Sequence, residues 1–233
     1  MSANYTLPSP AKIAGSTFRL NRVQAANPSR GGQHQTVDLA EPLWSAQIAT
    51  TPLSDAQAGQ YDALFARLRG TARTVDVYDA RRPRPIAYRS TPNSGVTAAS
   101  TGTLAATTAV LASHTSQPWG APFIVGINRA LSTLAIQGFT PGATLSPGDY
   151  IAWDDGPARR LHIVVTAGTV NSIGAIEIAV EPPPPGTPTA ILPATAYMEK
   201  AAAEMVIVQF DHPWRVGQSS AASFSAVQVL RRY

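Results

Sequence analysis

Between residues 43 and 79 the hydrophobic pattern changes from a period of two to a helical period and back again. Trp44, Ala46 and Ile48 alternate with other residues, which predicts a strand that buries one face. Val75 and Val77 show the same alternation at the far end of this stretch. The pattern therefore predicts a strand, a helix and a second strand in direct succession.

The predicted helix runs from about Asp55 to Arg69 and has favourable residues at both ends. Ser54 is a good N-cap, and Gln57 stands where a capping-box partner reaches back to it. Gly70 is a natural residue for the position just after a helix. An apolar stripe with i, i+3, i+4, i+7 spacing needs a sheet to cover it, and its members are Tyr61, Leu64, Phe65 and Leu68.

Most of the remaining chain consists of short strand-like stretches separated by turn residues. Pairs such as Pro141-Gly142 and Pro147-Gly148 are typical of these turns. Many short strands with regular turns favour a sandwich or barrel, so we expect a mainly β protein. Alternation predicts strands at 17–23, 133–139, 175–181 and 224–230, and continuous apolar runs predict buried strands at 161–166 and 205–210.

Two stretches break this pattern and divide the chain. Residues 90–118 are mostly Ser, Thr, Ala and Gly, which predicts a long loop. Residues 182–196 begin with four consecutive prolines, which predicts a stiff, extended spacer. We therefore expect two domains: residues 1–95 and 197–233 form one, and residues 96–196 form an inserted β domain with its flanking linkers.

The composition is globular, with few charges. The formal net charge is +4, and the only lysines are Lys12 and Lys200, so the positive charge is almost all arginine. A net charge this small does not by itself indicate nucleic-acid binding. The absence of cysteine excludes disulfides, thiolate metal sites and cysteine nucleophiles. The chain begins without a basic stretch and apolar run, and it has no run of 18 apolar residues; we expect a soluble protein without signal peptide or membrane span.

Candidate catalytic groups have weak support in the sequence. His162 lies in an apolar strand, where a structural role is favoured, although a metal site built from distant His and Asp side chains stays open. Asp149 and the Asp154-Asp155 pair could serve acid–base chemistry, but acidic residues beside glycine are more typical of turns. Serine-nucleophile and phosphate-binding motifs are absent, so we expect no enzyme and no cofactor. The other histidines are His34, His114 and His212.

A cluster of arginines follows the second strand of the opening pattern. Pro83 and Pro85 favour an extended loop here, and guanidinium groups suit paired hydrogen bonds with carboxylates across protein interfaces. Nucleic-acid binding would be better served by interleaved aromatic residues, and few occur. We therefore predict a protein interface, formed by Arg81, Arg82, Arg84 and Arg89.

Several of these segments together resemble the distal tail proteins and related minor tail proteins of long-tailed (siphovirus-like) phages and gene transfer agents. In the first half the resemblance lies in Trp44 with its alternating strand and in the helical segment 52–70. In the second half it lies in 134–138, 144–151, 161–164, the strand ending at Glu181-Pro182, and 210–215.

The resemblance implies a tail-tube-like domain, a β-sandwich or barrel with one docked helix, that carries an inserted small β-barrel-like domain. In that family six copies usually form a ring between the tail tube protein and the baseplate hub protein, with DNA only passing through the lumen. Inserted domains there project outward and can hold tail fibres or touch host surface glycans. The implied role is a structural virion protein at the tail tip, assembled in the host cytoplasm.

Other functions stay open at this point. Within the virion, the chain could be a tail-tube or tail-terminator subunit. A carbohydrate-binding module would use Trp119, Tyr150 or Trp153 as stacking platforms. A glycan-cleaving enzyme would use carboxylates among Asp149, Asp154 and Glu177.

Overall fold

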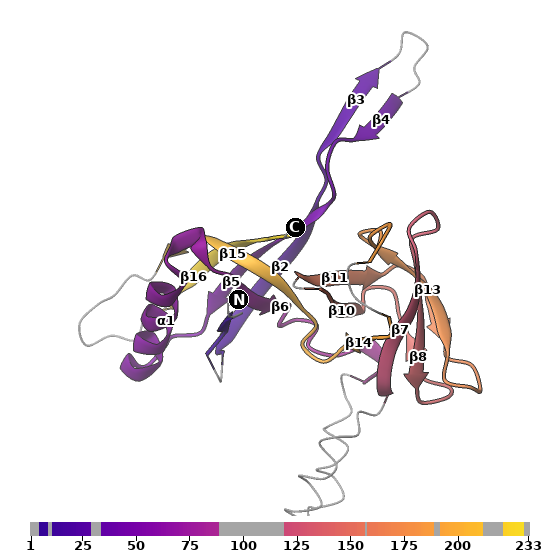
Figure 1. Ribbon diagram of the computed structural model, residues 1–233. Helices are drawn as coiled ribbons and strands as arrows, with labels where there is room; N and C mark the ends of the chain where they lie inside the picture. The colour runs from indigo at the N-terminus through magenta and orange to yellow at the C-terminus, as the bar shows by residue number, and fades with distance from the viewer. Residues whose placement is uncertain are drawn as a thin grey trace, which may run out of the picture. The chain divides into compact units, whose positions relative to one another are not determined.

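The computed structural model describes residues 5–8, 11–28, 34–88, 119–156, 158–188, 192–211 and 221–230. Within these ranges the protein is mainly β, with one α-helix (Figure 1). The chain separates into two compact units, Met1–Arg81 with Ala202–Tyr233, and Arg82–Ala201. The predicted loop at 90–118 lies outside the described residues.

The first unit is built on one six-stranded sheet with the order β1-β6-β15-β16-β5-β2. Alternating residues on its central strands are buried, including Trp44, Ala46 and Ile48, as the pattern predicts. Ser16 on β2 nevertheless hydrogen bonds Asp79, which follows β6 near the other edge, so the sheet is strongly curved. The strands are β1 (Tyr5–Thr6), β2 (Ile13–Asn21), β5 (Leu43–Thr50), β6 (Val75–Tyr78), β15 (Ala202–Asp211) and β16 (Ser223–Gln228).

Helix α1 (Asp55–Leu68) packs on one face of this sheet (Figure 1). The main-chain N–H of Ser54 donates to Gln57 Oε1 at 3.2 Å, which confirms one arm of the capping box. Arg69 and Gly70 both have positive φ, and the short 3-10 helix η1 (Gly70–Ala72) follows. Phe65 is half-buried and stacks on a ring of β15, with 3.5 Å between its centroid and that of Phe210.

The predicted strand at 17–23 overlaps the second half of β2, which ends at Asn21, and a hairpin that the sequence pattern did not predict follows it. This hairpin consists of β3 (Gln24–Pro28) and β4 (His34–Asp38), which pair with each other and form a separate two-stranded sheet. Figure 1 shows the hairpin extending beyond the end of β2. We refer to it as the arm.

The second unit is a closed barrel with the strand order β10-β11-β13-β8-β7-β14. Its strands pair antiparallel, and β14 closes the barrel by pairing with both β7 and β10. A short two-stranded sheet and the 3-10 helix η2 (Ile86–Tyr88) complete the unit. The strands are β7 (Gly120–Asn128), β8 (Thr133–Phe139), β10 (Tyr150–Asp155), β11 (Ala158–Val164), β13 (Ile176–Glu181) and β14 (Ala194–Tyr197), with β9 (Thr144–Leu145) paired to β12 (Gly168–Thr169).

The proline run is part of the barrel unit, which corrects the prediction of a spacer. Pro184 and Pro185 are buried, and the carbonyl oxygen of Pro182 lies 2.7 Å from His162 Nδ1. Strand β14 begins at Ala194, inside the segment predicted to be extended spacer. The sequence pattern does not predict this packing, because prolines suit both a free spacer and a chain held against a barrel.

The two units also divide at other positions than the sequence analysis placed them. The compact units meet at Arg81/Arg82 and Ala201/Ala202, whereas the predicted divisions were at 95/96 and 196/197. The physical reason is that residues 82–88 and 199–201 hydrogen bond to each other and to barrel residues. These two segments therefore belong with the barrel.

Candidate functional site

Three of the four predicted interface arginines lie in the described part of the chain, and their environments differ. Arg81 belongs to the first unit, and Arg82 and Arg84 belong to the barrel unit. Arg89 lies outside the described residues. The predicted cluster is therefore not one continuous patch within either unit, and its place at a subunit boundary stays a prediction.

Arg82 and Arg84 hold together the two segments that lead into and out of the barrel. Arg82 Nη1 donates to the carbonyl oxygen of Gly148 at 2.8 Å, and its guanidinium lies 5.6 Å from the ring centroid of Tyr150. Arg84 pairs with Glu199 at 2.9 Å. The main-chain N–H of Lys200 donates to the carbonyl oxygen of Pro83 at 2.7 Å, which brings the two segments side by side. We call this set of contacts the clasp.

Asp149 supports the clasp from inside the barrel unit. Its carboxylate is buried and accepts hydrogen bonds from the main-chain N–H groups of Ser146 at 2.8 Å and Ile86 at 2.7 Å. A carboxylate that caps two backbone donors in this way fixes a turn. The turn interpretation of Asp149 is confirmed by Oδ2, which accepts from Ser146 within the turn, while Oδ1 ties that turn to Ile86, 63 residues away in the chain.

Arg81 is held by a buried carboxylate in the first unit. Arg81 Nε and Nη2 donate to the two oxygens of Asp79 at 3.1 and 2.9 Å, and Ser16 Oγ donates to the same carboxylate at 2.5 Å. Burial alone would raise the pKa of Asp79, but the hydrogen bonds from Arg81 and Ser16 and the charge of Arg81 outweigh it, so this pKa is lowered. The Asp79 side chain is 0% exposed and that of Arg81 is 51% exposed, so a fixed carboxylate aims a guanidinium toward solvent.

The arm and the two residues at its base, Val23 and Leu39, offer apolar side chains that their own unit does not bury. Val23, Val37 and Leu39 are 55%, 53% and 63% exposed. Asp38 of the arm accepts a hydrogen bond from Gln24 Nε2 at 2.7 Å and pairs with Arg22, just before the arm, at 3.8 Å. A two-stranded hairpin is at best marginally stable alone in water, so the arm is suited to packing on another surface.

The aromatic residues considered as sugar platforms are buried in the barrel unit. Trp119 is 2% exposed, Trp153 is 0% and Tyr150 is 5%. Trp119 and Trp153 belong to the barrel's hydrophobic core. A stacking platform must be exposed, so these three rings do not form one.

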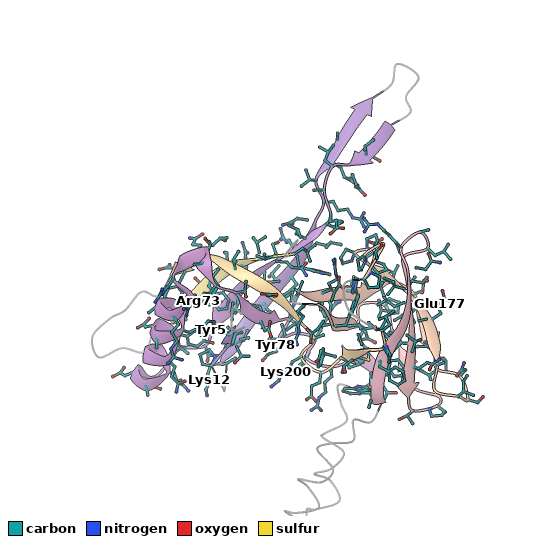
Figure 2. The ribbon with its side chains drawn as sticks, in the orientation of Figure 1. Tyr5, Lys12, Arg73, Tyr78, Glu177 and Lys200 are labelled. Carbon is teal, nitrogen blue, oxygen red and sulfur yellow. The ribbon has the colours of Figure 1, made fainter. Side chains whose placement is uncertain are left out.

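The carboxylates considered for acid–base chemistry have structural partners. Asp154 pairs with Arg159 at 2.7 Å across the hairpin of β10 and β11. Glu177 on β13 accepts a hydrogen bond from Thr133 at 2.7 Å, and Figure 2 labels its exposed side chain. Both carboxylates are therefore held by neighbouring strands of the barrel unit.

His162 is a buried histidine of strand β11, as the structural interpretation predicts. Burial lowers its pKa to about 4, with the positive charge of Arg160 acting in the same direction. Among the described residues there is no group of three or more His, Asp or Glu side chains that could hold a metal ion. The side chain of His34 and all of His114 and His212 lie outside the described residues.

Comparison with known proteins returns neither a matching protein family nor a matching curated protein. Within the described residues, no helix is long and apolar enough to cross a membrane.

Proposed function

We propose that this protein is a ring-forming structural component of a phage tail tip, of the distal tail protein type. The single observation that carries the proposal is the arm, a hairpin that exposes apolar side chains beyond the sheet that it leaves. Such a hairpin is stabilised when it packs on a neighbouring subunit. The resemblance of segments 44–70 and 134–182 to that family gives the proposal its biological setting.

A ring needs two different surfaces on each subunit, because each copy contacts its two neighbours head to tail. The arm supplies one surface, and the body of the next first unit supplies the other. Repeated around a closed ring, this contact buries Val23, Val37 and Leu39 once in every subunit. Complete burial of one such side chain stabilises the contact by roughly 1.5–3 kcal/mol.

In this proposal the first unit is the tail-tube-like part and the barrel unit is the inserted part. The tail tube protein and the baseplate hub protein are the partners above and below the ring, and DNA passes through its lumen. The barrel unit is the part that tail fibres or host surface glycans would contact. The protein would be assembled in the host cytoplasm and would remain in the virion.

The experiment is a comparison of the full chain with a variant that lacks the arm. The main-chain N–H of Leu39 donates to the carbonyl oxygen of Val23 at 2.8 Å, so an Asn-Gly turn can replace residues 24–38. The variant also carries Val23→Ser and Leu39→Ser, because these two exposed side chains at the base of the arm would otherwise remain. We expect the parent to form closed rings by electron microscopy and light scattering, and the variant to be a folded monomer.

A milder variant provides a second test. Val37→Ser with Leu39→Ser should raise the protein concentration at which rings form by at least tenfold, without changing the circular dichroism spectrum. A parent that stays monomeric at all concentrations contradicts the proposal, and so do intact rings made from the armless variant.

A further inference from the structure

The face of the first sheet that is opposite α1 contains a hollow of about 730 Å³. Phe65 of α1 stacks on Phe210 and meets Phe224 edge to face, which marks the covered face. Residues on either side of Phe224 in β16, Ser223 and Ser225, point to the other face and line the hollow.

Two rows of side chains cross four strands at the hollow. Strand register aligns each row across β2, β5, β16 and β15. The first row has hydroxyl and amide groups, and the second has small residues that leave room above the sheet. The first row is Thr17, Gln47, Ser225 and Gln209, and the second is Gly15, Ala49, Ser223 and Asp211.

Charged side chains of opposite sign line the two ends of the hollow, and the one beside β2 is ion-paired with Asp79. Arg81 lines it beside β2, where the buried Asp79 and Ser16 hold its guanidinium. Asp211 lines it on β15, at the opposite end of the second row. A guanidinium fixed in this way is suited to a carboxylate, and the exposed Asp211 is suited to a cation.

The dimensions of the rows match a short extended peptide. Neighbouring strands lie about 4.8 Å apart, so four strands span roughly 14 Å. Four or five residues of extended chain have the same length, at about 3.3 Å per residue. Amide and hydroxyl side chains along the first row can hydrogen bond to peptide groups, and the lining residues with exposed side chains include no aromatic ring on which a sugar could stack.

From this geometry we infer that the hollow binds an extended segment of a partner protein, with an acidic residue at Arg81 and a basic residue about four positions away at Asp211. This site is independent of the arm, and it would operate in a monomer or in a ring. Failure of the inference therefore leaves the proposed ring function standing, and failure of the ring leaves the hollow testable.

The test is a titration of the full chain, followed by NMR, with the acetylated and amidated peptide Glu-Ser-Gly-Ser-Lys. We expect saturable shifts of the amide signals of Gly15, Ala49 and Ser225. The matched peptide Gln-Ser-Gly-Ser-Gln should bind at least tenfold more weakly, because it lacks both charges.

Two variants locate the binding. Gly15→Leu places a side chain in the hollow, and a Cβ added at Gly15 meets nothing within 4 Å, so the fold should be retained while binding falls at least tenfold. Arg81→Gln should reduce binding of the charged peptide to that of the neutral one, and should leave the neutral peptide unchanged.

Three results would overturn the inference. The first is binding of the charged peptide that neither variant alters. The second is tighter binding of N-acetylneuraminic acid than of the peptide at the same residues, which would make the hollow a site for acidic sugars. The third is a shift of the Gly15 and Ala49 signals with protein concentration alone, which would make a second copy the occupant.

Discussion

At the scale of single residues, His162 couples the stability of the barrel unit to pH. Its pKa falls from 6.5 to about 4 on folding, mainly because the ring is buried. The unfolded chain therefore binds more protons than the folded one between these values, so stability decreases as pH falls through this window and levels off below it. The full difference corresponds to about 3 kcal/mol.

The expected result is a loss of about 3 kcal/mol in the opening free energy of β10 and β11 between pH 7 and pH 4, measured by amide hydrogen exchange. The control is His162→Asn, which offers an amide nitrogen to the carbonyl of Pro182 and does not titrate. Between pH 7 and pH 4 the opening free energy of this variant should fall by about 3 kcal/mol less than that of the parent. If the opening free energies of the two proteins depend on pH in the same way, another group is responsible.

Phe65 gives a prediction about how the helix is anchored. Its ring stacks on Phe210 and lies 5.8 Å from Phe224, so Phe65→Ala removes contacts with β15 and β16. Because Phe65 is only half-buried, we expect the free energy of unfolding to fall by about 3 kcal/mol, the lower end of the range for truncating a phenylalanine to alanine. Chemical denaturation measures it, with the exposed Ala63→Ser as a control that should stay within about 0.5 kcal/mol.

At the scale of elements, the sequence pattern was most informative where one face is buried. Alternation in 43–50 and the stripe of α1 predicted those elements closely, because burial requires apolar residues at fixed spacing. The arm strands carry mostly polar residues, and their described side chains are exposed, so they left no such signal. Strand β14 was missed because it follows a proline-rich stretch that also suits a spacer.

The candidate site was harder to predict for a different reason. The sequence predicted that Arg81, Arg82, Arg84 and Arg89 lie at a protein interface, which stays a prediction. The carboxylate partners described for Arg81 and Arg84 belong to the same chain. The sequence could not indicate Glu199 as a partner, because the fold alone brings residues so far apart in the chain into contact. Local composition predicts the chemistry of a segment, whereas the identity of a distant partner depends on topology.

The clasp allows the internal and intersubunit roles of Arg84 to be separated. Arg84→Glu breaks the pair with Glu199, and adding Glu199→Arg restores an internal pair with the charges exchanged. If Arg84 also contacts a neighbouring subunit, we expect the double variant to recover barrel stability but not ring assembly. Sedimentation measures assembly, and amide exchange of β14 measures the barrel.

Either result of that comparison is informative. Rings restored by the double variant would limit Arg84 to the clasp and contradict its role at a subunit boundary. A salt-dependent affinity of the parent for DNA, lost in Arg82→Glu with Arg84→Glu while rings persist, would instead indicate a phosphate-binding surface.

At the scale of the whole molecule, the barrel unit is inserted between two paired strands of the first sheet. Tyr78 on β6 lies opposite Ala202 on β15 in an antiparallel register, so the ends of the insertion are neighbours. Replacing residues 82–201 with a short Gly-Ser linker should therefore leave a folded first unit. Retained helical and strand circular dichroism with a cooperative thermal transition would confirm this, and an unfolded product would show that the units depend on each other.

The adjacency of Tyr78 and Ala202 also has a consequence for the order of folding. When the barrel is unfolded, pairing β6 with β15 requires closure of a very long loop, which is slow because chain entropy is lost before any contact forms. Once the barrel has folded, its clasped ends stand side by side, and the same pairing becomes as local as a hairpin. The inserted unit would thus set the rate at which the first sheet forms. A stopped-flow experiment should show slower refolding of the sheet when Trp153→Ala weakens the barrel, even though Trp153 lies in the other unit.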